Sequence, residues 1–268
     1  MTATRLPTYF ISHGGGPWPW MKEQMGGAYD RLEAALARMP ADIGAAPRAV
    51  LMLSAHWEAP RFTVQTHPNP PMVYDYGGFP EFTYHIKYPA PGAPDVAARV
   101  RALLAAAGIE SAEDAQRGFD HGMFAPMAVI WPQAGVPTVQ LSLKKGLAPD
   151  EHLALGRALA PLRDEGVLIV GSGLSYHNLR AFGPAAHAPS AAFDAWLADT
   201  LAIDDAATRA RTLAAWERAP AAREAHPREE HLLPLMVALG AAEHDAATRT
   251  YHERDFFGGI TVSSFRLG

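Results

Sequence analysis

Three short runs of nearly uninterrupted apolar residues constrain the fold of this chain more than any other feature. The runs are "RAVLMLSAH" (48–56), "VPTVQLSL" (136–143) and "VLIVGSGL" (167–174), and a shorter one, "YFI", occupies residues 9–11. Strands that are apolar along their whole length are typical of parallel sheets, in which helices cover both faces. The runs therefore predict the central strands of an α/β sheet.

Alanine-rich segments with a helical pattern lie between and after these strands. They cover residues 21–39, 94–108, 149–166 and, with interruptions, 189–242. In the third of them, Pro149 and Asp150 favour a helix start and Gly166 favours a helix end. Strands that alternate with helices of this length are typical of parallel sheets with crossover connections.

The chain closes with two runs that alternate apolar and polar residues, over 248–256 and 259–267. They meet at Gly258 and Gly259, which predicts a C-terminal β-hairpin. With the preceding patterns, this predicts an α/β fold in which residues 1–268 form one three-layer α/β/α domain around a mostly parallel mixed sheet.

Composition excludes several classes of function. A net charge of −5 gives no reason to expect nucleic acid or an anionic membrane as a partner. No apolar run approaches the roughly 20 residues of a membrane helix, and the N-terminus lacks the apolar core of a signal peptide, so a cytoplasmic protein is expected. The absence of cysteine excludes disulfides, thiolate metal sites and cysteine nucleophiles. Twelve histidines are then the only side-chain nitrogen ligands for a transition metal.

Three of the histidines follow predicted strands: His13 after the first, His56 after the second and His177 after "VLIVGSGL". Ligands of open α/β sheets bind beyond the carboxyl ends of the strands, so these side chains are expected to converge there. The glycines of "SHGGGP" are consecutive and lack the spacing of a phosphate-binding loop. They are interpreted instead as residues that clear space around His13.

Further histidines lie outside the strand ends. His226 and His231 flank the expected start of a helix in "AHPREEHLLPL", where an ordinary exposed helix start is the alternative. His121 follows Asp120 in a segment expected to be a loop between strands. A set of imidazoles suits Zn, Fe(II), Mn or Cu. Neither a His-Glu-x-x-His nor a Gly-x-Ser-x-Gly string occurs, which argues against a metalloprotease and a serine hydrolase.

Seven motifs occur together in one order. They are "SHGGGP", "SAHWE", "YDYGGFPEFTYHIKYPAPG", "GFDHG", "VPTVQLSL", "GSGLSYHNLR" and "EEHLLPLMVALGAA". In this order, from about residue 7 to the C-terminus, the chain resembles the class III extradiol ring-cleavage dioxygenases of the protocatechuate β-subunit type. It resembles most the 4,5-DOPA extradiol dioxygenase branch.

The resemblance implies a role for five histidines. His13, His56 and His231 match metal ligands, whereas the protocatechuate enzymes have a glutamate at the third position. His177 matches the acid–base histidine and is a possible fourth ligand, and His121 matches a second histidine of the pocket. Glu229 and Glu230 are weaker candidates for a ligand. The implied metal is Fe(II), and zinc also fits a site of three imidazoles.

The implied reaction opens a catechol ring with dioxygen and yields a muconic semialdehyde. Imidazole accepts and returns protons near neutral pH, which suits His177 with the help of His121. Residues 59–92 are rich in proline, glycine and aromatic residues, which predicts a long loop that acts as a lid or a binding loop. Within it, the segment 74–92 is the candidate aromatic wall or lid, with Phe79 and Tyr84 as candidate substrate contacts. A monomer or homodimer is expected. A zinc hydrolase that uses the same histidines and a non-catalytic binding relative are the alternatives.

Overall fold

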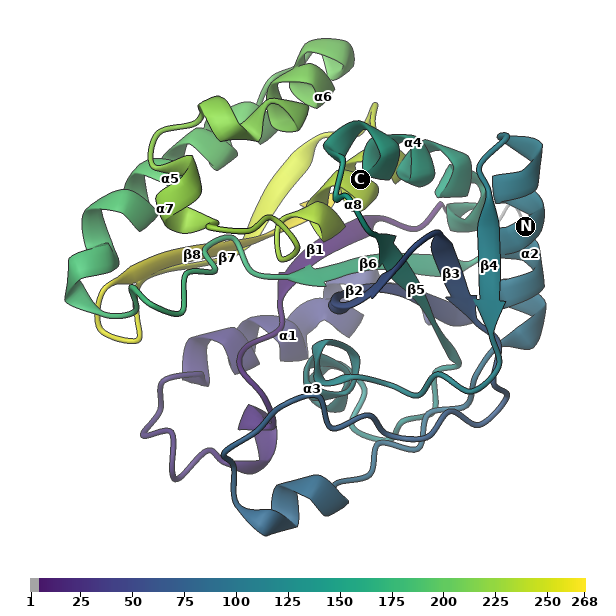
Figure 1. The fold of residues 1–268 in the computed structure, drawn as a ribbon, viewed down its shortest axis with the longest axis horizontal. Coiled ribbons are helices and arrows are strands. Elements are labelled where there is room, and N and C mark those ends of the chain that lie inside the picture. The colour runs from purple at the N-terminus through teal and green to yellow at the C-terminus, as the bar shows by residue number, and fades with distance from the viewer. Residues whose placement is uncertain (1–4) are drawn as a thin grey trace.

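The computed structural model describes residues 5–268, and a single eight-stranded sheet runs through it (Figure 1). The strand order is β4-β3-β5-β2-β6-β1-β8-β7. The strands are β1 (Thr8–Ser12), β2 (Ala49–Ala59), β3 (Phe62–Gln65), β4 (Ser111–Asp114), β5 (Thr138–Lys144), β6 (Val167–Gly173), β7 (Ala247–Phe256) and β8 (Ile260–Leu267). The central strands β5, β2, β6 and β1 pair in parallel, and β8 and β7 form the predicted antiparallel hairpin.

Helices cover both faces of the sheet, which confirms the predicted α/β fold class (Figure 1). One face carries α2 (Pro94–Ala106), α4 (Pro149–Leu159), α5 (His187–Leu201), α6 (Ala206–Ala214) and α8 (Leu233–Ala241). The other face carries α1 (Asp30–Ile43) and α3 (His121–Ile130), and the short α7 (Ala222–Ala225) packs on α5. Within residues 5–268, no helix combines the length and the apolar character that crossing a bilayer requires.

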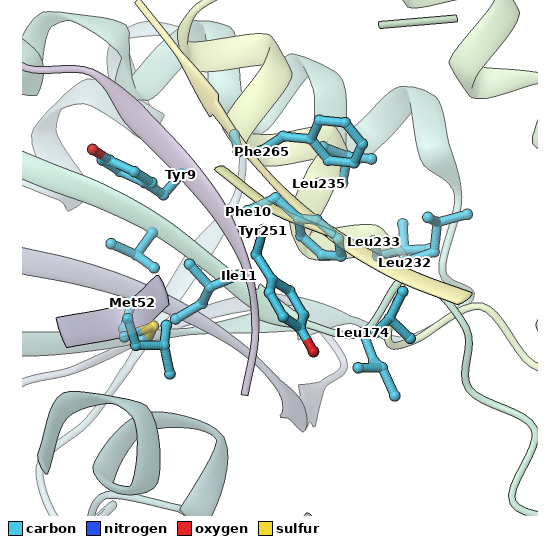
Figure 2. Packing of buried hydrophobic residues seen from close by; sticks show 14 of the residues in the cluster. Tyr9, Phe10, Ile11, Met52, Leu174, Leu232, Leu233, Leu235, Tyr251 and Phe265 are labelled. Atoms are coloured by element: carbon cyan, nitrogen blue, oxygen red, sulfur yellow. The ribbon is translucent and has the colours of Figure 1, made fainter. Parts of the chain in front are cut away.

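The central strands are buried on both sides because their residues alternate between two apolar clusters. In β2, Val50 and Met52 belong to the cluster under α1 and α3, whereas Leu51 and Leu53 belong to the cluster under α2 and α4. In β1, Phe10 points toward α8 and Ile11 points toward Met52, as Figure 2 shows. Each such side chain contributes about 1.5–3 kcal/mol through burial. The core therefore fixes the strand ends that carry the histidines.

The first predicted helix, 21–39, starts later than expected. Residues 21–29 form turns, and α1 begins at Asp30. Gly26 and Gly27 adopt φ values of 56° and 81°, which no right-handed helix contains. The amphipathic pattern before them therefore belongs to a turn, and the prediction was wrong there. The predicted region 189–242 is resolved into the helices α5 to α8.

Two parts of the chain that were expected to be loops are regular. Strand β3 lies within the proline- and glycine-rich segment 59–92 and pairs with β4 and β5. His121 is the first residue of α3, not a loop residue, and its helix continues through Pro126. Strand β2 also continues past His56 to Ala59, with an irregular register between Leu53 and Glu58. His56 therefore lies in this irregularity and not at the end of the strand.

Candidate metal centre

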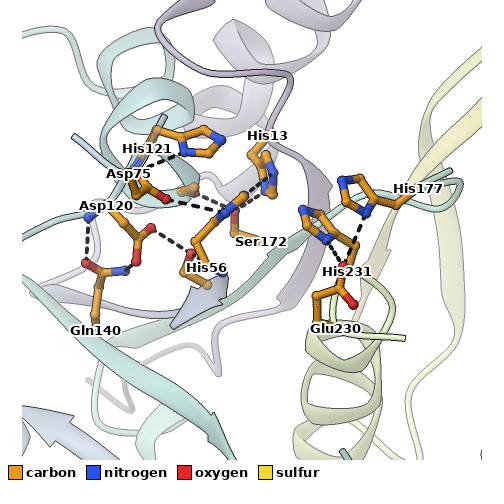
Figure 3. A network of polar contacts seen from close by, with 12 residues as sticks. His13, His56, Asp75, Asp120, His121, Gln140, Ser172, His177, Glu230 and His231 are labelled. Carbon is orange, nitrogen blue, oxygen red and sulfur yellow. Dashed lines mark hydrogen bonds and ion pairs between the residues drawn. The ribbon is translucent and has the colours of Figure 1, made fainter. Parts of the chain in front are cut away.

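Five histidine rings meet beyond the carboxyl ends of β1 and β6 and beside the irregular stretch of β2 (Figure 3). The ring of His13 lies 4.9 Å from that of His56 and 5.2 Å from that of His231, measured between centroids. The rings of His56 and His231 are also 4.9 Å apart. His121 lies 4.0 Å from His56, and His177 stacks on His231 at 3.3 Å. The structure thus brings together the five histidines that the sequence analysis selected as site residues.

Backbone hydrogen bonds fix the segments that carry these rings. The amide of His13, directly after β1, donates to the Gly173 carbonyl at the end of β6. The amide of Leu174 donates to the carbonyl of His231, just before α8, and the amide of His177 donates to Ala225. Three separate stretches of chain are therefore joined at one end of the sheet. The convergence follows from the parallel arrangement of β1 and β6.

An oxygen acceptor lies beside the Nδ1 atom of each of His13, His56 and His121. His13 Nδ1 lies 3.0 Å from the Ser172 hydroxyl, which itself donates to the Gly122 carbonyl at 2.5 Å, so His13 must be the donor. His121 Nδ1 lies 2.9 Å and His56 Nδ1 lies 3.3 Å from the Asp75 carboxylate. A proton on each Nδ1 leaves the Nε2 atoms unprotonated.

Glu230 holds the other two histidines in the same way. Its carboxylate lies 2.9 Å from His231 Nδ1 and 3.2 Å from His177 Nδ1. Figure 3 shows both contacts, with Glu230 on the far side of the rings from His13. A carboxylate that accepts a hydrogen bond from the outer nitrogen of a histidine is the usual support of a metal ligand.

The resulting arrangement suits a cation. The Nε2 atoms of His13 and His56 lie only 3.1 Å apart, and both protons are engaged at Nδ1, so two lone pairs face each other. Potential ligand atoms of His13, His56 and His121 lie within 4.8 Å of one another, as do those of His177, Glu230 and His231. The first of these sets consists of imidazoles alone and fits a first-row transition metal such as iron or zinc.

Electrostatics keep the expected ligands in the metal-binding form. Burial, and then the neighbouring imidazoles, lower the pKa of His13 well below its usual range. Burial likewise lowers the pKa of His231 well below that range and the pKa of His56 to about 4. Burial opposes ionisation of Glu230, but hydrogen bonds from His177 and His231 outweigh it and lower the pKa of this carboxyl. The imidazoles are therefore neutral, as metal binding requires.

A polar network beneath the site supports His56. The Asp120 carboxylate accepts hydrogen bonds from Ser54 at 2.6 Å, from Gln140 at 2.9 Å and from Arg117 at 2.9 Å. Asp120 is fully buried and directly precedes His121. The network joins the irregular stretch of β2 to the start of α3, so it fixes His56 and His121 relative to each other.

A cavity of about 280 Å³ opens over the five histidines. Its other walls are mostly apolar. They comprise Gly14, Gly15 and Gly16 together with Tyr29, Leu174, Leu179, Phe182, Phe256 and Phe257. A small, largely apolar cavity above a cluster of imidazoles suits a flat aromatic molecule that coordinates a metal.

The glycine run after His13 also makes room for protein side chains. A Cβ on Gly14 would lie 2.4 Å from the indole nitrogen of Trp18, which donates to the His13 carbonyl at 2.7 Å. The amide of Gly15 donates to the Tyr29 hydroxyl. All three glycines also line the cavity beside His13, so the expected cleared space is present, and the aromatic residues that pack against the same run hold the turn.

The candidate substrate contacts Phe79 and Tyr84 lie behind the cavity and do not line it. Phe79 packs against Gly16, and both rings lie about 5.5 Å from Tyr76, whose ring in turn contacts His121. Their effect on substrate would be indirect, and a lid role for 74–92 stays a prediction.

Other residues considered from the sequence lie apart from the five rings. His226 is fully buried, not exposed as the alternative supposed, and donates from Nε2 to the Ser175 carbonyl. Glu229 forms an ion pair with Arg223. The sequence analysis missed Asp75 and Ser172, whose only signal was their position within two of the seven motifs.

Comparison with known proteins decides the family. Residues 7–265 match the family described as the catalytic LigB subunit of aromatic ring-opening dioxygenase. The chain belongs to this family. The resemblance found from the seven motifs is thereby confirmed.

Relatives within the family are similar along most of their length. The chain is 39% identical to a 4,5-DOPA dioxygenase extradiol of Beta vulgaris, with 82% of this chain and 83% of that protein covered. It is 32% identical to a protein of the same name from Escherichia coli K12, with 100% and 97% covered. It is 35% identical to dioxygenase tasH of Hapsidospora irregularis, with 98% and 85% covered. The crystal structure of an uncharacterized Escherichia coli K12 protein superposes with a TM-score of 0.79 at 26% identity and covers 98% of this chain.

Proposed function

We propose that this protein is a metal-dependent extradiol dioxygenase that opens the ring of a catechol-type, DOPA-like substrate and forms a muconic semialdehyde. One observation carries the proposal. Five imidazoles converge beneath an apolar cavity, and the Nδ1 atom of each faces a carboxylate or a serine hydroxyl, which turns Nε2 inward. Family membership and the names of the relatives support the same reaction class.

His13, His56 and His231 are the proposed ligands of Fe(II). They come from three separate segments whose rings lie close together. Burial keeps all three imidazoles neutral. Fe(II), when bound, supplies a Lewis acid for both catechol oxygens and a route for electrons from the ring to dioxygen. The cavity brings both reactants to one place, which removes much of the entropic cost of their encounter.

His177 and His121 are the proposed proton carriers. Each ring lines the cavity, and each has its Nδ1 held by a carboxylate, Glu230 for His177 and Asp75 for His121. With Nδ1 protonated, Nε2 is free to accept the proton that a catechol loses on binding and to return it later. The carboxylates would stabilise the imidazolium in between.

The apolar walls have a second role. Phe182, Phe256 and Leu174 replace water around the reacting centre. A dry cavity strengthens the electrostatic contacts within it and protects reactive intermediates from water.

The test is reconstitution with Fe(II) without oxygen, followed by addition of a catechol and then air. DOPA, protocatechuate and gallate form a first panel. We expect dioxygen uptake in equal amount to the catechol consumed, with a yellow ring-opened product. Protein loaded with zinc is the control, because zinc has no redox chemistry and should consume no dioxygen. Ester or amide hydrolysis by the zinc form, without oxygen uptake by the iron form, would favour the zinc-hydrolase alternative instead.

A further inference from the structure

Two consecutive residues at the tip of the C-terminal hairpin line the cavity above the histidines. Phe256 is the last residue of β7 and Phe257 follows it, and both belong to the cavity wall. Successive side chains of a strand point to opposite faces, so a strand that continued through both residues would direct only one of them inward. Phe257 instead has a φ of 50°, in the left-handed region that residues other than glycine rarely adopt. The alternation therefore ends at Phe257, and both residues reach the same cavity.

Aromatic contacts hold the Phe257 ring between two walls of the cavity. Its centroid lies 5.3 Å from that of Tyr29, just before α1, and 5.8 Å from that of Phe182, in the segment after β6. The Phe256 ring meets it at 4.8 Å and an interplanar angle of 88°. Aromatic rings at these separations attract one another. Phe257 thus joins three segments that are distant in the sequence.

Phe257 also lies where the cavity opens to solvent. Its side chain is 38% exposed, and Leu179, another wall residue, is 71% exposed. Among the described residues that line the cavity, these two are the large apolar residues at the surface, whereas His13 and His231 at the floor are buried. Phe257 and Leu179 therefore flank the mouth. A non-glycine residue in the left-handed region is strained, and such strain concentrates at ligand-binding sites.

From this arrangement we infer that Phe257 is a specificity-determining residue that limits the width of the substituent on the catechol ring. A catechol whose two hydroxyls face the imidazoles has the opposite edge of its ring at the mouth, beside Phe257. An unbranched substituent passes between Phe257 and Leu179. A substituent that branches at the carbon attached to the ring overlaps the Phe257 ring, and packed aromatic walls yield only at a cost. This role of Phe257 rests on the proposed function, because it assumes that the hydroxyls bind at the histidines.

Two uncharged probes test this role: 4-ethylcatechol and 4-tert-butylcatechol, which differ only in branching at the carbon attached to the ring. In the iron-loaded wild type, kcat/KM for 4-tert-butylcatechol should be at least about tenfold below that for 4-ethylcatechol. In Phe257→Gly, the ratio of the two values should rise at least about tenfold in favour of 4-tert-butylcatechol. Glycine removes the ring and accepts the left-handed backbone without strain, so the hairpin should keep its fold. Phe257→Tyr keeps the ring and should keep the wild-type ratio.

Phe82→Gly is the matched control, because Phe82 is 48% exposed and does not line the cavity, and it should leave the ratio as in the wild type. The same ratio, measured as Kd by calorimetry on zinc-loaded protein, separates the role of Phe257 from the proposed function. A ratio of Kd values that shifts in Phe257→Gly, without dioxygen uptake by the iron form, would contradict only the dioxygenase. An unchanged ratio in Phe257→Gly, or equal turnover of both catechols by the wild type, would overturn the role of Phe257 and leave the dioxygenase in place.

Discussion

At the scale of single residues, Asp75 and Glu230 each contact two histidines through their carboxylates. Asp75 accepts from His56 and His121, and Glu230 accepts from His231 and His177. Each carboxylate thus links one proposed metal ligand to one proposed proton carrier. The orientation of all four rings depends on two side chains that bind neither metal nor substrate in the proposal.

Replacing either carboxylate by its amide should weaken the metal site. In Asp75→Asn and Glu230→Gln, one amide oxygen remains, but the negative charge that favours the Nδ1 proton is lost. Metal affinity should fall about 10- to 100-fold, measured by competition with a chelator. Glu81→Gln is the control, because Glu81 is exposed and, among residues 5–268, pairs only with His85. Wild-type affinity in both amide variants would show that the carboxylates do not support the ligands.

Substitution of His177 distinguishes a role as proton carrier from a role as metal ligand. His177→Ala should retain iron and still bind catechol, while turnover falls by about a hundred- to ten-thousandfold. His177→Gln should be about as inactive, because an amide does not carry a proton at neutral pH. Iron per chain and turnover are measured on the same preparation. Parallel loss of iron and activity would instead make His177 a ligand.

At the scale of structural elements, the turn after β1 positions His13. Gly14 has φ of 77°, and Trp18 occupies the space where a Cβ would lie. Gly14→Ala should therefore displace Trp18 from the His13 carbonyl, lower the free energy of unfolding by about 2 kcal/mol and abolish tight metal binding. Thermal unfolding and metal content provide the measurement.

Gly44→Ala is the matched control for this turn. Gly44 ends α1 with a similar φ of 71°, and nothing lies within 4 Å of its potential Cβ. It should destabilise through backbone strain alone and keep its metal. Normal metal binding in Gly14→Ala would show that the turn does not set the position of His13.

Elements were predictable where the local pattern and the tertiary structure agree. Strands β2, β5 and β6 follow from long apolar runs that only a doubly covered sheet can bury. Strand β3 has four residues and is fixed by its partners β4 and β5, so no local signal marks it. Helix α3 is buried on nearly all sides and contains a proline, so it lacks an amphipathic period. Asp75 reaches His121 across 46 residues, which no local pattern encodes.

Buried neutral histidines make the stability of the whole molecule depend on pH. His152 donates from Nδ1 to the Ala148 carbonyl and accepts at Nε2 from the Lys144 amide, and burial lowers its pKa from 6.5 to about 4. Burial lowers the pKa of His226 to about 3. In the unfolded chain both take up a proton below about pH 6.5. The unfolded state then binds more protons, so stability is lost as the pH falls from 6.5 toward 4 and 3.

His152→Gln should reduce this loss. Each such histidine contributes about 1.4 kcal/mol per pH unit below 6.5, so the metal-free variant should lose about 2 kcal/mol less than the wild type between pH 6.5 and 5. Urea unfolding at several pH values measures it. Between pH 7 and 8, where His152 is neutral in both states, the difference between the two proteins should stay constant. Equal acid sensitivity of both proteins would contradict the assignment of a buried neutral His152.

The incorporation of isotopically labelled dioxygen tests the central proposal most directly. Iron-loaded protein is given 4-ethylcatechol and labelled dioxygen, and the product is reduced at once with borohydride so that its aldehyde oxygen does not exchange with water. Mass spectrometry should then find both labelled atoms in the product, one in the new carboxylate and one in the alcohol formed from the aldehyde. A product labelled only from water, or a catechol oxidised without label, would contradict an extradiol dioxygenase.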